Sequence, residues 1–140
     1  MNRQELMEIL PHRDHMLLVD EAHMEDEAAV GQYTVRGDEF FLQGHFPGNP
    51  VVPGVILCEM MGQCSCVLMA QQLAGATPYF SGMDKVRFRR KVVPGDTIVF
   101  TTRLVNSKGA FYFISGTGSV GDQVCVSADL SFAVVANPAG

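Results

Sequence analysis

The composition of the chain changes abruptly at Pro53, and this change constrains the fold more than any other feature. Residues 44–54 are rich in Gly and Pro, which fit neither a helix interior nor a regular strand, so an irregular loop is expected there. Proline fits the first turn of a helix, and the next proline after Pro53 is Pro78. The sequence therefore predicts one helix from Pro53 to about Ala74, roughly 20 residues and about 30 Å long.

The predicted helix is apolar almost all round, which is typical of a helix that is buried on every side. Glu59 is the only charged residue between Pro53 and Gln71, and Gln63 lies one turn further along the same face. Burying an unpaired carboxylate is costly. Glu59 is therefore expected to have a partner or a chemical role.

His45 is the nearest upstream candidate for that partner, because it lies in the Gly-Pro loop that leads into the helix. Glu59 is about 9 Å along the helix axis from Pro53, so a loop that folds back could bring the imidazole close to it. An imidazole and a carboxyl at the mouth of an apolar cavity could act as an acid/base pair. A structural hydrogen-bonded pair is the alternative interpretation.

Bulk properties narrow the classes of function. A chain of 140 residues with 47% hydrophobic content predicts a single domain over residues 1–140. Its net charge of −5 argues against a nucleic-acid binder. The four Cys lack paired C-x-x-C spacing and a nearby His cluster, so no zinc site is expected, and reduced thiols fit a cytosolic setting.

Neither a signal peptide nor a membrane span is expected. Residues 1–10 include Glu5 and Glu8 and predict a short amphipathic helix stopped by Pro11. The apolar window 51–70 contains Glu59 and Gln63, which favour a buried helix over a membrane helix.

The polar cluster at residues 12–15 (His-Arg-Asp-His) precedes the apolar run 16–19. Three adjacent ligands on one short loop have poor geometry for a metal ion, so no metal site is expected. The pattern instead favours the start of a strand with surface ion pairs.

Alternation of apolar and polar residues predicts strands over much of the remaining chain. The predicted strands are 28–36, 83–92, 97–105, 110–115 and 123–135, with a helical turn at 39–42 and a loop at 116–122. One long helix with five or six antiparallel strands around it is an α+β arrangement. A single sheet covers only part of such a helix, so a partner subunit is expected on the open side.

Three segments then carry a family resemblance, in their order and spacing. They comprise residues 44–48, 53–55 and 57–63 (GHFPG, PGV and LCEMMGQ), residues 10–13 and 17–20 (LPHR and LLVD), and residues 79–88 (YFSGMDKVRF). The first segment resembles the active-site segment of the 3-hydroxyacyl-[acyl-carrier-protein] dehydratases of FabZ type, and the others are similar to that family's other two signatures. Asp14 and His15 depart from the family, which usually has an aromatic residue and Pro there.

The resemblance implies a hot-dog fold, in which an antiparallel sheet wraps around one long central helix. It also implies a hydro-lyase of fatty acid biosynthesis, without cofactor or metal, that converts a (3R)-3-hydroxyacyl thioester to the trans-2-enoyl product. His45 would remove the C2 proton, and Glu59 of the neighbouring chain would protonate or hold the departing 3-hydroxyl. Amides of Gly54 and Val55, at the positive end of the helix, would hydrogen-bond the thioester carbonyl.

Further roles follow more loosely from the same resemblance. Gln63 would orient Glu59, and Tyr79 and Phe80 would line or gate the acyl tunnel, with ordinary packing as the alternative for all three. The family forms homodimers, often assembled as trimers of dimers.

Lys85, Arg87, Arg89 and Lys91 alternate along the predicted strand 83–92 and would share one face of it. They could form a solvated face or a guarded sheet edge. A basic stripe on an acidic protein would also steer an acidic partner. The resemblance supplies one, the acyl carrier protein with its acyl-phosphopantetheine arm.

Two other classes of function fit the sequence. One is different chemistry on the same fold, by a hot-dog thioesterase or by a FabZ-like dehydratase/isomerase; Glu59 in place of Asp argues mildly against the bifunctional dehydratase/isomerase relatives. The other is a non-catalytic acyl-binding scaffold, against which the presence of both His45 and Glu59 weighs.

Overall fold

The computed structural model describes residues 1–44 and 48–138. The helices are α1 (Arg3–Leu6) and α2 (Gly54–Ser65), with 3-10 turns η1 (Asp14–Met16), η2 (Phe40–Leu42) and η3 (Cys66–Met69). The strands are β1 (Glu21–Glu25), β2 (Ala28–Thr34), β3 (Ala76–Phe88), β4 (Thr97–Lys108), β5 (Phe111–Val120) and β6 (Gln123–Ala136).

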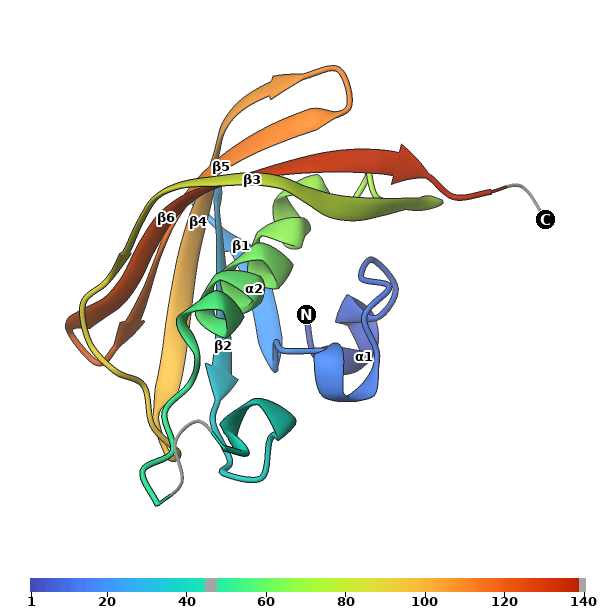
Figure 1. The fold of residues 1–140 in the computed structure, drawn as a ribbon. Coiled ribbons are helices and arrows are strands. Elements are labelled where there is room, and N and C mark those ends of the chain that lie inside the picture. Colours follow the sequence, from blue (N-terminus) through green and yellow to red (C-terminus); the bar gives the residue numbers. More distant parts are fainter. Residues whose placement is uncertain (45–47, 139–140) are drawn as a thin grey trace.

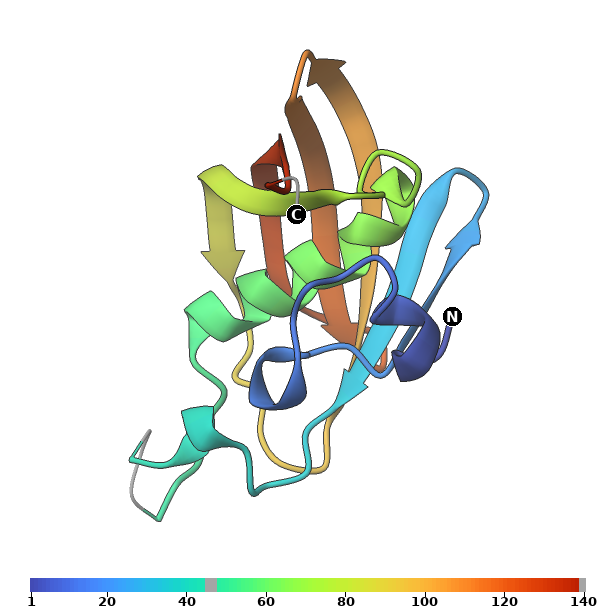
Figure 2. The ribbon, with the colours of Figure 1, turned by 90° about the vertical axis from the view of Figure 1, so that its right-hand side faces the viewer.

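The six strands form one antiparallel sheet in the order β1-β2-β4-β5-β6-β3. The sheet curves around α2, and the N-terminal segment covers the other side of that helix (Figures 1 and 2). The predicted α+β arrangement, with the sheet around one central helix, is therefore confirmed. The strands predicted at 28–36, 97–105 and 123–135 correspond to β2, β4 and β6, with small differences at their ends.

The central helix is shorter than predicted. α2 ends at Ser65 after 12 residues and continues only as the 3-10 turn η3. The Ser65 hydroxyl and the Cys66 thiol both donate to the carbonyl of Gly62, at 2.6 and 3.4 Å, and such bonds compete with regular helical hydrogen bonds. The helix is also not buried on every side, because Val55 in its first turn is 68% exposed.

The loop predicted at 116–122 is wrong, because β5 continues to Val120 and turns only at residues 121–122. The glycines that suggested a loop serve close packing instead. A Cβ at Gly116 would lie 2.7 Å from Thr102 Cγ2, and one at Gly118 would lie 2.7 Å from a ring carbon of Phe100. Glycine is found in a strand interior where another group approaches this closely.

The strand start predicted after residues 12–15 is also wrong. Residues 14–16 form η1, the buried residues 17–19 belong to no strand, and the first strand is Glu21–Glu25. β1 was missed because it is an edge strand in which four of five residues are exposed, so it lacks an apolar face. The amphipathic helix predicted before Pro11 is limited to Arg3–Leu6.

Glu39 is a buried carboxylate that anchors the chain between β2 and η2. It accepts hydrogen bonds from the Tyr33 hydroxyl and from the backbone amides of Arg36 and Gly37, each at 2.8 Å. Burial alone would raise the pKa of Glu39, but these hydrogen bonds outweigh it and lower the pKa. Burial and the neighbouring carboxylate raise the pKa of Tyr33. Glu39 thus fixes the chain a few residues before position 45.

We expect Glu39→Gln to lower the free energy of unfolding by about 1.5–3 kcal/mol at pH 7, since three donors lose a charged acceptor. The native pKa lies below the ordinary value of 4.5, so this stabilisation is complete above pH 4.5 and is lost as the pH falls through the native pKa. Urea unfolding at a series of pH values should therefore show wild type and variant converging on acidification.

The matched control is Asp38→Asn, one residue earlier. Asp38 is exposed, and its carboxylate lies 3.2 Å from the Arg36 guanidinium. An exposed pair of this kind contributes little, so the change in stability should stay below about 0.5 kcal/mol. Equal losses in the two variants would contradict the anchoring role of Glu39.

Candidate active site

Glu59 lies on α2, and two side chains contact one of its carboxylate oxygens. Gln63 Nε2 donates to Glu59 Oε2 at 2.9 Å, and His12 Nε2 lies 3.3 Å from the same oxygen. The i, i+4 spacing on the helix accounts for the Gln63 contact. Within the described part of the chain, Oε1 of Glu59 accepts no hydrogen bond. The side chain is 22% exposed, so one oxygen is fixed while the other can reach a ligand.

Gln63 is itself held by the N-terminal segment. Its Oε1 accepts from the amide of Leu18, and its Nε2 also donates to the carbonyl of Met16, both at 2.8 Å. The side chain is almost completely buried. A buried amide with all these partners has little freedom to rotate, so Gln63 presents a fixed N–H to Glu59.

His12 is the residue of this site that sequence reasoning missed. The polar pattern at residues 12–15 predicts surface ion pairs, but the imidazole of His12 contacts Glu59. Arg13 beside it donates to the carbonyls of Met7, Leu10 and His12 and pairs with no carboxylate among the described residues. The contact between His12 and Glu59 joins distant parts of the chain, so no local spacing predicts it; the LPHR segment was the available signal.

A small pocket of about 40 Å³ lies beside Glu59. Its lining is His12, Glu59, Gly62, Gln63, Cys66, Pro78, Phe80 and Phe132. The ring of Phe80 stacks on Phe132, with centroids 4.7 Å apart. Tyr79 is 57% exposed and does not line this pocket, because neighbouring strand residues point to opposite faces. The structure therefore brings Gln63 and Phe80 to Glu59 and leaves Tyr79 apart.

A second hollow, of about 690 Å³, surrounds the start of α2. It is lined by residues 51–55, 57 and 88–92. The amides of Gly54 and Val55 have no carbonyl one turn earlier in the helix, and they lie at the positive end of its dipole. A Cβ at position 54 would lie 2.6 Å from the ring of Phe88, so only glycine allows this contact.

The two hollows have no lining residue in common. Among the described residues, a single chain therefore places Gly54 and Val55 in a different pocket from Glu59. His45 lies outside the described residues.

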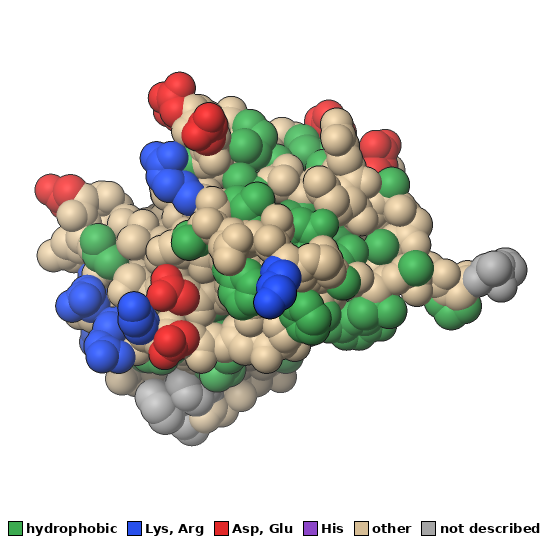
Figure 3. All heavy atoms as spheres, turned by 90° about the horizontal axis from the view of Figure 1, so that it is seen from above, with side chains coloured by type: hydrophobic (Ala, Val, Ile, Leu, Met, Phe, Trp, Pro, Cys, Tyr) green, Lys and Arg blue, Asp and Glu red, His purple; other side chains and the backbone are tan. Residues whose placement is uncertain are grey.

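The basic segment differs from the predicted stripe. β3 ends at Phe88, so Arg89 and Lys91 follow the strand, and a bulge between Asp84 and Arg87, with Lys85 at φ 52°, breaks the alternation. All four basic side chains are nevertheless exposed. Figure 3 shows Lys and Arg side chains gathered at one end of the molecular surface. The segment is thus a basic surface cluster rather than one strand face.

The thiols near Glu59 are poor nucleophiles. Burial, with a smaller contribution from the charge of Glu59, raises the pKa of Cys66 to about 12, and burial also raises the pKa of Cys58. Both therefore stay protonated at neutral pH. Across residues 1–44 and 48–138, no three His, Cys, Asp or Glu side chains are grouped so that they could hold a metal ion. In the same ranges, no helix is long and apolar enough to span a membrane.

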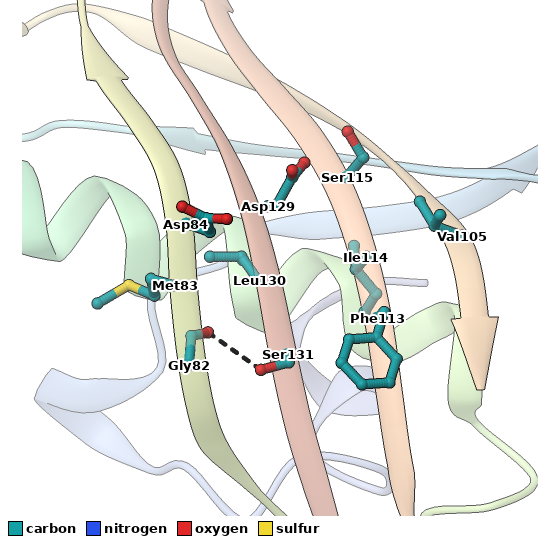
Figure 4. Close-up of a pocket in the computed structure, with 10 residues that line it drawn as sticks. All are labelled: Gly82, Met83, Asp84, Val105, Phe113, Ile114, Ser115, Asp129, Leu130 and Ser131. Atoms are coloured by element: carbon teal, nitrogen blue, oxygen red, sulfur yellow. Dashed lines mark hydrogen bonds between the residues drawn. The ribbon is translucent and has the colours of Figure 1, made fainter. Parts of the chain in front are cut away.

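A further cavity, of about 540 Å³, lies on the face of the sheet that points away from α2 (Figure 4). Asp84 and Asp129, which are paired across β3 and β6, point into it side by side. Its lining contains neither Glu59 nor any residue around it. This cavity is therefore separate from the site on α2.

The sequence of this chain is similar to proteins of one known family. A family model described as a FabA-like domain matches residues 10–129. The 3-hydroxyacyl-[acyl-carrier-protein] dehydratase FabZ of Moorella thermoacetica is 44% identical over 131 residues, covering 90% of this chain and 91% of that protein. FabZ of Clostridium perfringens is 39% identical over 137 residues, covering 96% and 99%.

Among solved structures, the dehydratase heterocomplex ApeI:P from Xenorhabdus doucetiae matches with a TM-score of 0.79 and 23% identity. The match covers 96% of this chain and 91% of that one. At this identity the likeness concerns the fold, and it agrees with the expected hot-dog arrangement.

Proposed function

The chain belongs to the family of FabZ-type 3-hydroxyacyl-[acyl-carrier-protein] dehydratases, and from this premise we propose that it is a hydro-lyase of fatty acid biosynthesis. Its substrate is a (3R)-3-hydroxyacyl-[acyl-carrier-protein] and its product the trans-2-enoyl thioester. The main structural support is the carboxyl group of Glu59, held at one oxygen and open at the other. This is the arrangement that a general acid needs.

In the proposed mechanism, His45 removes a proton from C2 of the acyl chain. Negative charge builds on the thioester carbonyl, where the amides of Gly54 and Val55 hydrogen-bond it. The C3–O bond breaks as Glu59 gives its proton to the hydroxyl, so that water leaves and the C2–C3 double bond forms. Return of the proton from His45 to Glu59, through solvent, restores the starting state.

We infer that the complete site needs two chains, because the Glu59 pocket and the hollow at the start of α2 are separate in one protomer. β3 supports this arrangement. In the part of the chain that the structure describes, it is an edge strand that pairs with β6 alone. Residues 79–85 on it are exposed, so it can add a second copy of the chain. In the proposed homodimer, Glu59 of one chain meets His45, Gly54 and Val55 of the other, and dimers can assemble further into a trimer of dimers.

The same pairing provides room for the acyl chain. The pocket beside Glu59 holds about one water molecule in a single chain, so an acyl group has to lie along its mouth, where Phe80 is part of the lining. The dimer contact would enclose that space. Gln63 orients Glu59 in this proposal, and Phe80 borders the acyl channel; Tyr79 is left as a contact near the mouth of the site.

The acyl carrier protein is the proposed partner, and the cytoplasm the proposed location. Lys85, Arg87, Arg89 and Lys91 are exposed, and the last two lie on the rim of the hollow at the start of α2. Their charge would attract an acidic carrier and bring its phosphopantetheine arm to Gly54.

The test is direct conversion of a 3-hydroxyacyl thioester and of its enoyl product by the purified protein, followed by enoyl absorbance in both directions. Reversible interconversion is expected. Release of free thiol would instead indicate a thioesterase, and a shifted double bond an isomerase. Binding without conversion would indicate a scaffold.

A further inference from the structure

We propose that His12 is a positioning residue for Glu59, an inference that rests on the proposed function. His12 Nε2 lies 3.3 Å from Glu59 Oε2, the same oxygen that accepts the N–H of Gln63. The imidazole lines the pocket beside Glu59 and is mostly buried. Two side chains from different parts of the chain therefore converge on one carboxylate oxygen.

The surroundings of the ring define which nitrogen carries the proton. Donation from His12 to the carboxylate beside it would require a hydrogen on Nε2. The other nitrogen, Nδ1, is buried and has no hydrogen-bond partner among the described residues. A hydrogen there would be a buried donor without an acceptor, which is costly, so the ring hydrogen is expected on Nε2. In that form the N–H group of His12 lies beside Glu59 Oε2.

The side chains of His12 and Gln63 would act on the carboxylate form of Glu59, which forms during catalysis. As Glu59 gives its proton to the leaving hydroxyl, the carboxyl becomes a carboxylate, and hydrogen bonds to a charged acceptor are stronger than those to a neutral one. The N–H groups of His12 and Gln63 would therefore stabilise Glu59 as water departs. Because both contact Oε2, they leave Oε1 as the oxygen that would transfer the proton.

Hydrogen bonds fix the position of the chain around His12. Arg13 donates to three carbonyls of residues 7–12, and residues 16 and 18 bond to Gln63. Residues 12–18 thus contact both the carboxylate and the amide that orients it. A segment fixed by hydrogen bonds in this way can keep a catalytic side chain within the narrow range of positions that proton transfer requires.

The first test compares His12→Leu, which removes the donor, with His12→Gln, whose amide nitrogen can reach the position of Nε2. We expect His12→Leu to lower kcat for dehydration about 10- to 100-fold with little change in KM, and His12→Gln to restore most of it. The matched control is His15→Leu in the same segment. His15 is exposed and its ring faces Phe40, so kcat should not change.

Thermal unfolding of each variant separates positioning from packing. Unchanged kcat in His12→Leu would overturn the inference, and so would equal losses of kcat in the Leu and Gln variants. Nitrogen chemical shifts of the His12 ring provide a readout that does not depend on turnover. Shifts of the Nε2–H form that change in the Glu59→Gln variant support the inference, even if the thioester assay shows no dehydratase activity. Shifts of the Nδ1–H form overturn it.

Discussion

Replacing Glu59 by Gln is expected to lower kcat for dehydration by about 10²- to 10⁴-fold, the contribution typical of a positioned general acid. The amide of Gln has nearly the shape of the carboxyl group. Its oxygen can still accept from Gln63 and lie beside His12, whose nitrogens are 2.9 and 3.3 Å from Oε2 of Glu59 in the wild type. What the variant cannot do is give a proton to the leaving hydroxyl. The loss should therefore appear in both reaction directions, with a stability close to wild type.

Rates with a 3-hydroxyacyl thioester and with its enoyl product, together with urea unfolding, measure both parts of this expectation. Glu8→Gln is the matched control, because Glu8 is an exposed carboxylate near α1. Its kcat should equal that of wild type. A Glu59→Gln protein that kept more than about a tenth of wild-type kcat would remove this residue from the proton-transfer step.

Local patterns predicted the parts of the molecule that depend on neighbouring residues. Glu59 and Gln63 are one turn apart on a helix, so their hydrogen bond follows from helical periodicity alone. Alternation likewise predicts the buried face of β6 at Val126, Leu130 and Phe132. Val124, which belongs to the same alternation, is instead 39% exposed. The sequence therefore predicted the central helix, the surrounding sheet and one of the two contacts of the Glu59 carboxylate.

Contacts between distant segments were not accessible in this way. His12 reaches Glu59 only because the N-terminal segment covers the side of α2 that the sheet leaves open (Figure 2). The pattern at residues 12–15 looks the same whether the imidazole points to solvent or to the helix. The length of α2 also depended on two side-chain bonds to Gly62, which a propensity argument does not include.

A single irregularity can also defeat a correct periodic argument. The basic residues at 85, 87, 89 and 91 alternate in the sequence, but the bulge between Asp84 and Arg87 changes which side chains share a face. Lys85, in a left-handed conformation, is part of this bulge. Alternation predicts a face only while the register is continuous. The basic character of the segment was therefore predictable, and its geometry was not.

Heterodimers that combine His45→Ala in one chain with Glu59→Gln in the other should be active, although each variant alone is inactive. If each site takes His45 from one chain and Glu59 from the other, one site of such a heterodimer carries both substitutions and the other carries neither. A two-fold symmetric dimer then retains about half of wild-type activity. Co-expression with two different affinity tags and sequential purification provides the heterodimer, and enoyl absorbance measures its rate.

The reciprocal heterodimer makes the test decisive, because it reverses the expectation. Wild type paired with a chain that carries both substitutions places one substitution in each shared site, so it should be inactive. If both residues of a site came from one chain, this pair would instead keep about half of the activity and the single-variant pair would have none. The separation of the Glu59 pocket from the hollow at Gly54 and Val55 within one protomer favours the shared site. Activity in the reciprocal heterodimer, with none in the first, would require both groups to act within one chain and would contradict the proposed dimer mechanism.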